Sequence, residues 1–138
     1  MTPKFRAWDK KTETIQEVES ISFKEKKLVI GQGNVAWFNS DYIRNFDDIE
    51  LMQSTGLEDK NGVEIFEGDI VAIENHPSQK KKGDMGVGME INGNYEIGWE
   101  KHDLTWCAGS LLLARLKLYV RVIGNIYENP ELLEEVKK

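Results

Sequence analysis

Residues 51–73 constrain the fold more than any other part of the sequence, because three turn signals follow one another there at short intervals. The signals are Thr55-Gly56, Asn61-Gly62 and Gly68-Asp69. Glycine adopts a positive φ without steric cost, and an aspartate or asparagine beside it can bond its own backbone. We therefore expect this stretch to double back on itself and then to begin a strand at residues 69–74.

For most of the rest of the chain, the sequence predicts short β-strands separated by polar turns. Alternating apolar and polar residues predict a hairpin from segments 4–8 and 14–18, and further strands at 21–23, 28–30, 35–38 and 49–53. Segment 39–48 is typical of a loop or a short helical turn, and segment 74–84 of an exposed loop. No helix of any length is expected before residue 100.

A second hairpin is expected around Asn92-Gly93, between segments 85–91 and 95–99. A two-residue loop and a three-residue loop over 92–94 give opposite registers. We favour the three-residue loop because it pairs Ile91 with Tyr95 and makes one continuous apolar face, although rings can also cover glycines.

Near the C-terminus, the sequence predicts a short helical turn at 111–116, a strand at 117–123 that turns at Gly124-Asn125 and extends through 126–127, and a helix at about 130–137. Asn129 is the expected N-cap of that helix and Pro130 its first residue. We expect the strand near residue 120 to meet segment 51–73 in one barrel.

Composition limits the classes of protein to which the chain can belong. Its 138 residues fit one domain, or one core with an appended lobe. Cys107 is the only cysteine, which excludes an intramolecular disulfide and a thiolate metal site and favours a reducing cytosol. The first residues lack the apolar core of a signal peptide and no run reaches a membrane span, so we expect neither export nor membrane binding.

The net charge of −6 disfavours strong electrostatic capture of nucleic acid. Residues 1–50 hold 8 basic against 9 acidic residues, and residues 51–138 hold 10 against 15. A local basic patch remains compatible with these numbers.

Three stretches together resemble the YopX family of small phage and prophage proteins. They are Lys-Phe-Arg-Ala-Trp-Asp at 4–9, Thr-Gly-Leu-Glu-Asp-Lys-Asn-Gly at 55–62 with Glu-Gly-Asp-Ile-Val at 67–71, and Val-Ile-Gly-Asn-Ile-Tyr-Glu-Asn-Pro-Glu-Leu-Leu at 122–133. The resemblance implies a mainly β fold: a small, partly open Src-homology-3-like barrel with an N-terminal β-hairpin lobe and a short C-terminal helix. We place the lobe at 1–50, the barrel at 51–128 and the helix at 129–138. The resemblance also implies a protein of a phage or prophage in the bacterial cytoplasm, and it carries over no catalytic residue.

One candidate binding site combines a basic loop with aromatic side chains. Lys80, Lys81 and Lys82 form the only basic cluster, and Trp99 and Trp106 follow on the presumed barrel. Small barrels can hold single-stranded nucleic acid with such elements. A solvated loop and core aromatic residues are the simpler interpretation, given the net charge.

Candidate catalytic residues are sparse. Glu67 and Asp69 could share a strand face and His102 could assist them, but a turn residue bonding local amides is the simpler interpretation of Asp69. His76 and His102 lack metal-site spacing and are expected at the surface, and Cys107 is expected to be a small buried side chain. The sequence predicts no metal and no cofactor.

We therefore consider three hypotheses for the function of the protein. The first is a non-enzymatic interaction module that binds an unknown protein partner or itself as a homo-oligomer. The second is a single-stranded nucleic-acid-binding module that uses residues 80–82. The third is an enzyme that acts through Asp69, Glu67 or His102.

Overall fold

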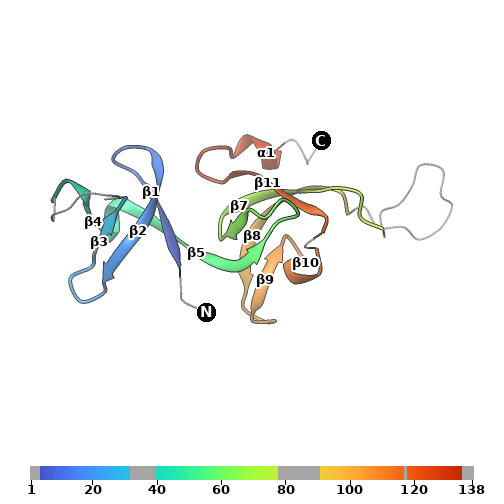
Figure 1. Ribbon diagram of the computed structural model, residues 1–138, viewed down its shortest axis with the longest axis horizontal. Coiled ribbons are helices and arrows are strands. Elements are labelled where there is room, and N and C mark those ends of the chain that lie inside the picture. The colour runs from blue at the N-terminus through green and yellow to red at the C-terminus, as the bar shows by residue number, and fades with distance from the viewer. Residues whose placement is uncertain (1–3, 32–39, 78–90, 117, 135–138) are drawn as a thin grey trace. The chain divides into compact units, whose positions relative to one another are not determined.

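The computed structural model describes residues 4–31, 40–77, 91–116 and 118–134. Within them the chain is mainly β, with two antiparallel sheets and one short α-helix (Figure 1). The strands of the first sheet follow the order β4-β3-β2-β1-β5-β6, and those of the second the order β10-β9-β8-β7-β11. The chain divides into two compact units, 1–54 and 55–138. The expected fold class, a small and partly open barrel with a hairpin lobe and a short helix, is confirmed.

The first unit is built from short strands and single helical turns. Its elements are β1 (Phe5–Asp9), β2 (Thr14–Ser22), β3 (Lys27–Ile30), the 3-10 turns η1 (Ser40–Tyr42) and η2 (Phe46–Asp48), β4 (Ile43–Asn45) and the first half of β5 (Ile49–Glu58). Strand β1 pairs with β2 on one side and with β5 on the other, which confirms the predicted N-terminal hairpin. The two expected strands at 14–18 and 21–23 form one strand, β2, whose register shifts between Val18 and Ser20. The predicted strand 35–38 lies outside the described residues.

The core of the first unit is small. Ala7, Leu28, Ile30 and Ile49 are buried together, and half-buried apolar side chains from β2, β5 and the helical turns pack around them.

The second unit contains the end of β5, β6 (Glu64–Phe66), β7 (Asp69–Ile73), β8 (Gly93–Glu100), β9 (Thr105–Ala108), β10 (Leu111–Leu112), the 3-10 turn η3 (Leu113–Arg115), β11 (Val120–Asn125) and α1 (Glu131–Glu134). All five residues of β7 are buried. Strand β7 lies between β8 and β11, so the expected meeting of segment 51–73 with the strand near residue 120 is confirmed.

Of the three turn signals in segment 51–73, two mark turns between strands. Gly62 (φ 82) and Gly68 (φ 84) adopt the left-handed conformation in the turns before β6 and β7. Thr55-Gly56 is not a turn, because both residues lie inside β5, where Gly56 has φ 77. A positive φ at glycine therefore marks an irregularity within a strand as well as a reversal.

The predicted turn at Asn92-Gly93 is wrong. Gly93 and Asn94 belong to β8, where they pair with Ile73 and Ala72 of β7. Residues 85–90, the other arm of the expected hairpin, lie outside the described residues. At 111–116 the structure has both a short strand, β10, and a 3-10 turn, η3.

The C-terminal segment turns at Asn125 and returns to the sheet. The Asn125 side-chain oxygen accepts hydrogen bonds from the amides of Tyr127 and Glu128, so residues 126–127 form a turn and do not extend the strand as expected. The Asn129 side-chain oxygen accepts a hydrogen bond from the Asn125 amide, which ties the end of β11 to the segment before α1. The role of Asn129 as N-cap of the helix stays a prediction. Asn94 of β8 donates to the Leu132 carbonyl of α1.

Candidate functional site

The hairpin of β8 and β9 brings the two predicted tryptophans together. Trp99 lies directly opposite Trp106 across the strands. Their rings meet edge to face, with centroids 5.1 Å apart and planes at 73°. Trp106 packs against the core of the second unit, whereas Trp99 remains 47% exposed. Edge-to-face pairs contribute about 0.5–1.5 kcal/mol beyond area burial, so the pair fixes the position of the exposed ring.

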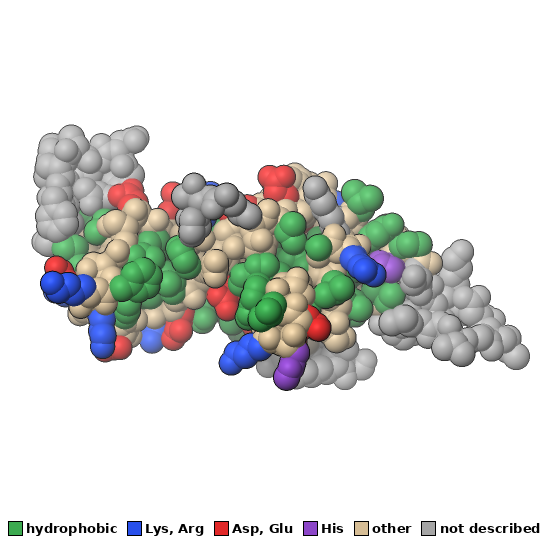
Figure 2. All heavy atoms as spheres, turned by 90° about the horizontal axis from the view of Figure 1, so that it is seen from below, with side chains coloured by type: hydrophobic (Ala, Val, Ile, Leu, Met, Phe, Trp, Pro, Cys, Tyr) green, Lys and Arg blue, Asp and Glu red, His purple; other side chains and the backbone are tan. Residues whose placement is uncertain are grey.

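The turn that joins these strands adds a further exposed apolar side chain. Leu104 is 72% exposed and adopts φ 51, a left-handed conformation that is uncommon for a non-glycine residue. Apolar side chains interrupt the charged surface on the face drawn in Figure 2. Exposed apolar groups gathered at one place are typical of interaction sites, whereas single ones are ordinary.

A shallow hollow of about 240 Å³ lies beside Trp99. It is lined by Glu96, Gly98, Trp99, Glu100, Cys107 and Gly109. Glu96, Gly98 and Glu100 alternate along β8 and therefore share one face of the strand. A Cβ added to Gly98 would have no atom within 4 Å, so bare backbone is open to an approaching molecule.

The charge around this hollow is negative. Glu96 is exposed and Glu100 half-buried, and a Glu100 carboxylate oxygen accepts a hydrogen bond from the His102 amide at 2.9 Å. Burial raises the pKa of the Cys107 thiol, and the carboxylates of Glu100 and Asp103 raise it further. Cys107, which is 6% exposed, is therefore a neutral buried thiol, as expected from the sequence.

The two tryptophans of the predicted nucleic-acid site lie together on the β8–β9 hairpin, but its three lysines are not among the described residues. Lys80, Lys81 and Lys82 lie outside the described residues. Glu96 and Glu100, on the opposite face of β8 from Trp99, make this hairpin negative, which is unfavourable for a phosphate backbone because like charges repel. The nucleic-acid hypothesis stays a prediction.

The candidate catalytic residues occupy structural or exposed positions. Asp69 is buried at the start of β7, and its carboxylate accepts a hydrogen bond from the Phe66 amide at 2.8 Å, as the turn interpretation predicts. Glu67 lies half-buried in the preceding turn, and His102 is exposed after β8. His76, expected at the surface, is half-buried with its ring centroid 4.9 Å from that of Tyr119. No three potential metal ligands converge in the ranges that the structure describes.

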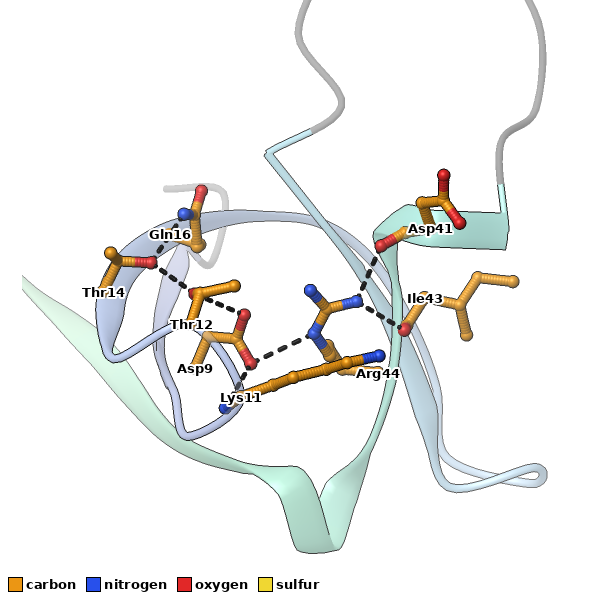
Figure 3. Close-up of polar contacts among 8 residues, drawn as sticks. All are labelled: Asp9, Lys11, Thr12, Thr14, Gln16, Asp41, Ile43 and Arg44. Atoms are coloured by element: carbon orange, nitrogen blue, oxygen red, sulfur yellow. Dashed lines mark hydrogen bonds and ion pairs between the residues drawn. The ribbon is translucent and has the colours of Figure 1, made fainter.

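The first unit contains a buried ion pair that no sequence pattern predicts (Figure 3). Arg44 Nε donates to Asp9 Oδ1 at 3.0 Å, and their side chains are 9% and 0% exposed. Thr12 and the Lys11 amide also donate to Asp9, while Arg44 Nη1 donates to the carbonyls of Asp41 and Ile43. Burial raises the pKa of Asp9, but these bonds outweigh it and leave the pKa below its ordinary value. The contacts described here hold the turn and strands together, so the pair is structural.

Asp59 plays a similar structural role in the second unit. One oxygen accepts from the amides of Asn61 and Val63, and the other accepts from the amide of Val122 in β11. Burial raises the pKa of Asp59, but the three amides and the charge of Arg121 together lower it. The carboxylate therefore joins the turn after β5 to an edge strand.

Among the elements described, no helix has the length and apolar character needed to cross a membrane. The comparison with curated proteins gives no match. Among solved structures, the chain is similar to protein EF1440 from Enterococcus faecalis, with 31% sequence identity and a TM-score of 0.63 over 96% of this chain and 99% of that one. The family model described as YopX protein matches residues 4–134, which include all three stretches on which the resemblance rests. The chain belongs to the YopX family.

Proposed function

We propose that the protein is a non-enzymatic interaction module, encoded by a phage or an integrated prophage and acting in the bacterial cytoplasm. It binds a protein partner through the β8–β9 surface, defined as Trp99, Leu104 and Trp106. The observation that carries the proposal is the half-exposed ring of Trp99, held by Trp106. Tryptophan is enriched among the residues that dominate binding energy at protein interfaces.

The placement of the polar side chains supports an interaction role over catalysis. Asp9, Asp59 and Asp69 are buried, and the bonds described above commit them to backbone amides or to Arg44. A general acid or base needs a position within reach of a substrate and a pKa suited to proton transfer. The low pKa values of Asp9 and Asp59 instead suit permanently ionised structural groups.

A comparison of partner capture by two variants tests this function. Trp99→Ala removes the exposed ring, and Val63→Ala is the matched control because Val63 is 48% exposed in a different turn of the same unit. Tagged proteins are isolated from host cells and their co-purifying proteins are quantified by mass spectrometry. We expect at least one protein to be depleted about tenfold or more with Trp99→Ala and retained with Val63→Ala, since interface anchors contribute about 2 kcal/mol or more.

Equal capture by both variants would contradict the proposal. Self-association through the same surface has a separate signature, because the wild-type protein would sediment as a concentration-dependent oligomer and Trp99→Ala as a monomer.

A further inference from the structure

Strand β8 extends beyond the end of β7, the strand that pairs with it on one side. The register between the two strands ends with Ile70 opposite Glu96. The last backbone bond on that side runs from the Gly68 amide to the Ile97 carbonyl at 2.9 Å. Strand β8 continues to Glu100, and among the described residues only β9 pairs with this last part of it. The end of β8 therefore has an unpaired edge on the side of β7.

The alternation of backbone hydrogen bonds identifies the groups that face this edge. In an antiparallel pair of strands, opposed residues alternate between those that exchange both backbone bonds and those that exchange none. The Gly109 amide donates to the Glu96 carbonyl, so every second residue from Glu96 onward bonds to β9. The carbonyl of Ile97 instead accepts from Gly68, on the side of β7. By the same alternation, the N–H and C=O of Trp99 point to the unpaired edge.

Both faces of the strand are open beside this edge. On one face the Trp99 ring is 47% exposed, with its position fixed by the contact with Trp106. On the other face a Cβ added to Gly98 would meet no atom within 4 Å. An approaching backbone therefore meets an exposed aromatic ring on one face and bare backbone on the other.

These features fit an added β-strand. Strand edges bind extended segments through main-chain hydrogen bonds, which give affinity, and through side-chain contacts, which give specificity. A residue opposite Trp99 would place its side chain on the same face as the indole ring. Gly68 occupies the position beside Ile97, so an added segment can pair only with the end of β8. The negative charge of Glu96 and Glu100 disfavours a nucleic-acid strand as the occupant.

From these observations we infer that the unpaired edge of β8 takes an extended segment of a partner protein, which pairs antiparallel with Trp99 and places an apolar side chain against its ring. The inference rests on the proposed function and specifies how the partner binds. The partner residue opposite Trp99 exchanges two backbone hydrogen bonds with it, and the neighbours of that partner residue direct their backbone groups away.

A peptide titration tests this inference with a defined probe. The probe is capped at both ends and carries one phenylalanine between two pairs of threonines. One comparison peptide is methylated on the phenylalanine nitrogen, which removes the donor that faces Trp99, and the other on the nitrogen of the next threonine, which faces away. Binding is followed by NMR through the backbone amide and indole N–H signals of Trp99. We expect saturable shifts with the probe, binding weaker by about threefold or more with the first methylated peptide, and unchanged binding with the second.

Hydrogen exchange provides a check on the free protein. We expect the Trp99 amide to exchange rapidly and the Gly98 amide, which bonds to β9, to exchange slowly. Addition of the probe should slow exchange at Trp99. Trp99→Ala should weaken probe binding, whereas Val63→Ala, at a residue of nearly equal exposure in another turn, should leave it unchanged.

The inference is overturned if the Trp99 amide is already protected in dilute free protein, if the probe fails to shift these signals at millimolar concentration, or if the two methylated peptides bind equally. Protection at Trp99 that rises with protein concentration would assign the edge to a second copy of the chain. Tighter binding of a single-stranded oligonucleotide to the same signals would assign it to nucleic acid, and either result would also overturn the inference. In each case a partner still captured through Trp99 would leave the proposed function standing, so the two failures are distinguishable.

Discussion

Single buried carboxylates connect segments that are distant in the sequence. Asp9 and Arg44 are 35 residues apart, and Asp59 and Val122 are 63 apart. The predicted hairpin and the Asn61-Gly62 turn signal place Asp9 and Asp59 next to turns, but a local pattern does not indicate the distant group that completes a hydrogen-bond set. The residues that stabilise each unit most specifically were therefore not predictable, although their turns were.

Removing the charge of Asp9 should be costly. Asp9→Asn leaves Arg44 buried without its counter-ion, and breaking a buried pair in this way destabilises by about 3–5 kcal/mol. Glu50→Gln is the control, because Glu50 pairs with Lys10 at 3.3 Å with both side chains 48% exposed. That change should cost less than about 1 kcal/mol in urea denaturation. Equal costs for the two variants would show that Asp9 contributes no more than a surface charge.

The Asp59 carboxylate should contribute stability that depends on pH. Its pKa is lower in the folded protein than in the unfolded chain, so its contribution is present above the unfolded pKa of about 3.9 and is lost as the pH falls through the folded pKa. Asp59→Asn replaces an accepting oxygen by an amide and should cost about 1–3 kcal/mol near neutral pH. Denaturation at several pH values should show the difference from wild type shrinking below about pH 4. A difference that stays constant down to pH 2 would contradict the assigned role.

At the level of elements, strands were more predictable than their partners. The alternation of residues located β1 and most of β2, and the turn signals located β7, but the pattern placed a hairpin turn at Asn92-Gly93 where β8 begins. Periodicity records which side chains face a core, whereas pairing across 20 residues depends on tertiary packing. The Trp99 and Trp106 pair carried a usable signal, since the two tryptophans flank a short, mostly polar segment at 100–105. Aromatic residues on either side of a turn are frequent cross-strand partners in a hairpin.

The close packing of β11 against the C-terminal turn predicts the effect of a methyl group. A Cβ at Gly124 would lie 2.8 Å from Asn129 Cγ and 2.9 Å from its Cβ, so the turn before α1 would have to move. We expect Gly124→Ala to destabilise by about 1–3 kcal/mol, the usual range for overpacking. Gly98→Ala is the control within the same sheet, because its Cβ meets no atom within 4 Å. Thermal unfolding of both variants checks the expectation, and a neutral Gly124→Ala would contradict it.

At the scale of the molecule, the two compact units raise the question of independent folding. The predicted domains, 1–50, 51–128 and 129–138, stay predictions, and β5 contributes residues to both units. If the units are separate domains, Asp9→Asn should lower hydrogen-exchange protection at Ala7 and Leu28 and leave Val71 and Ile97 unchanged. Loss of protection at all four amides would indicate a single cooperative unit.

The central claim is that the β8–β9 surface contacts a protein partner, and site-specific photo-crosslinking tests it most directly. A photoreactive phenylalanine analogue replaces Trp99 in one sample and Val63 in another, two side chains of nearly equal exposure. In host cells we predict a discrete protein adduct from position 99 and none of that mass from position 63. The same adduct from both positions, or none from position 99, would contradict the claim.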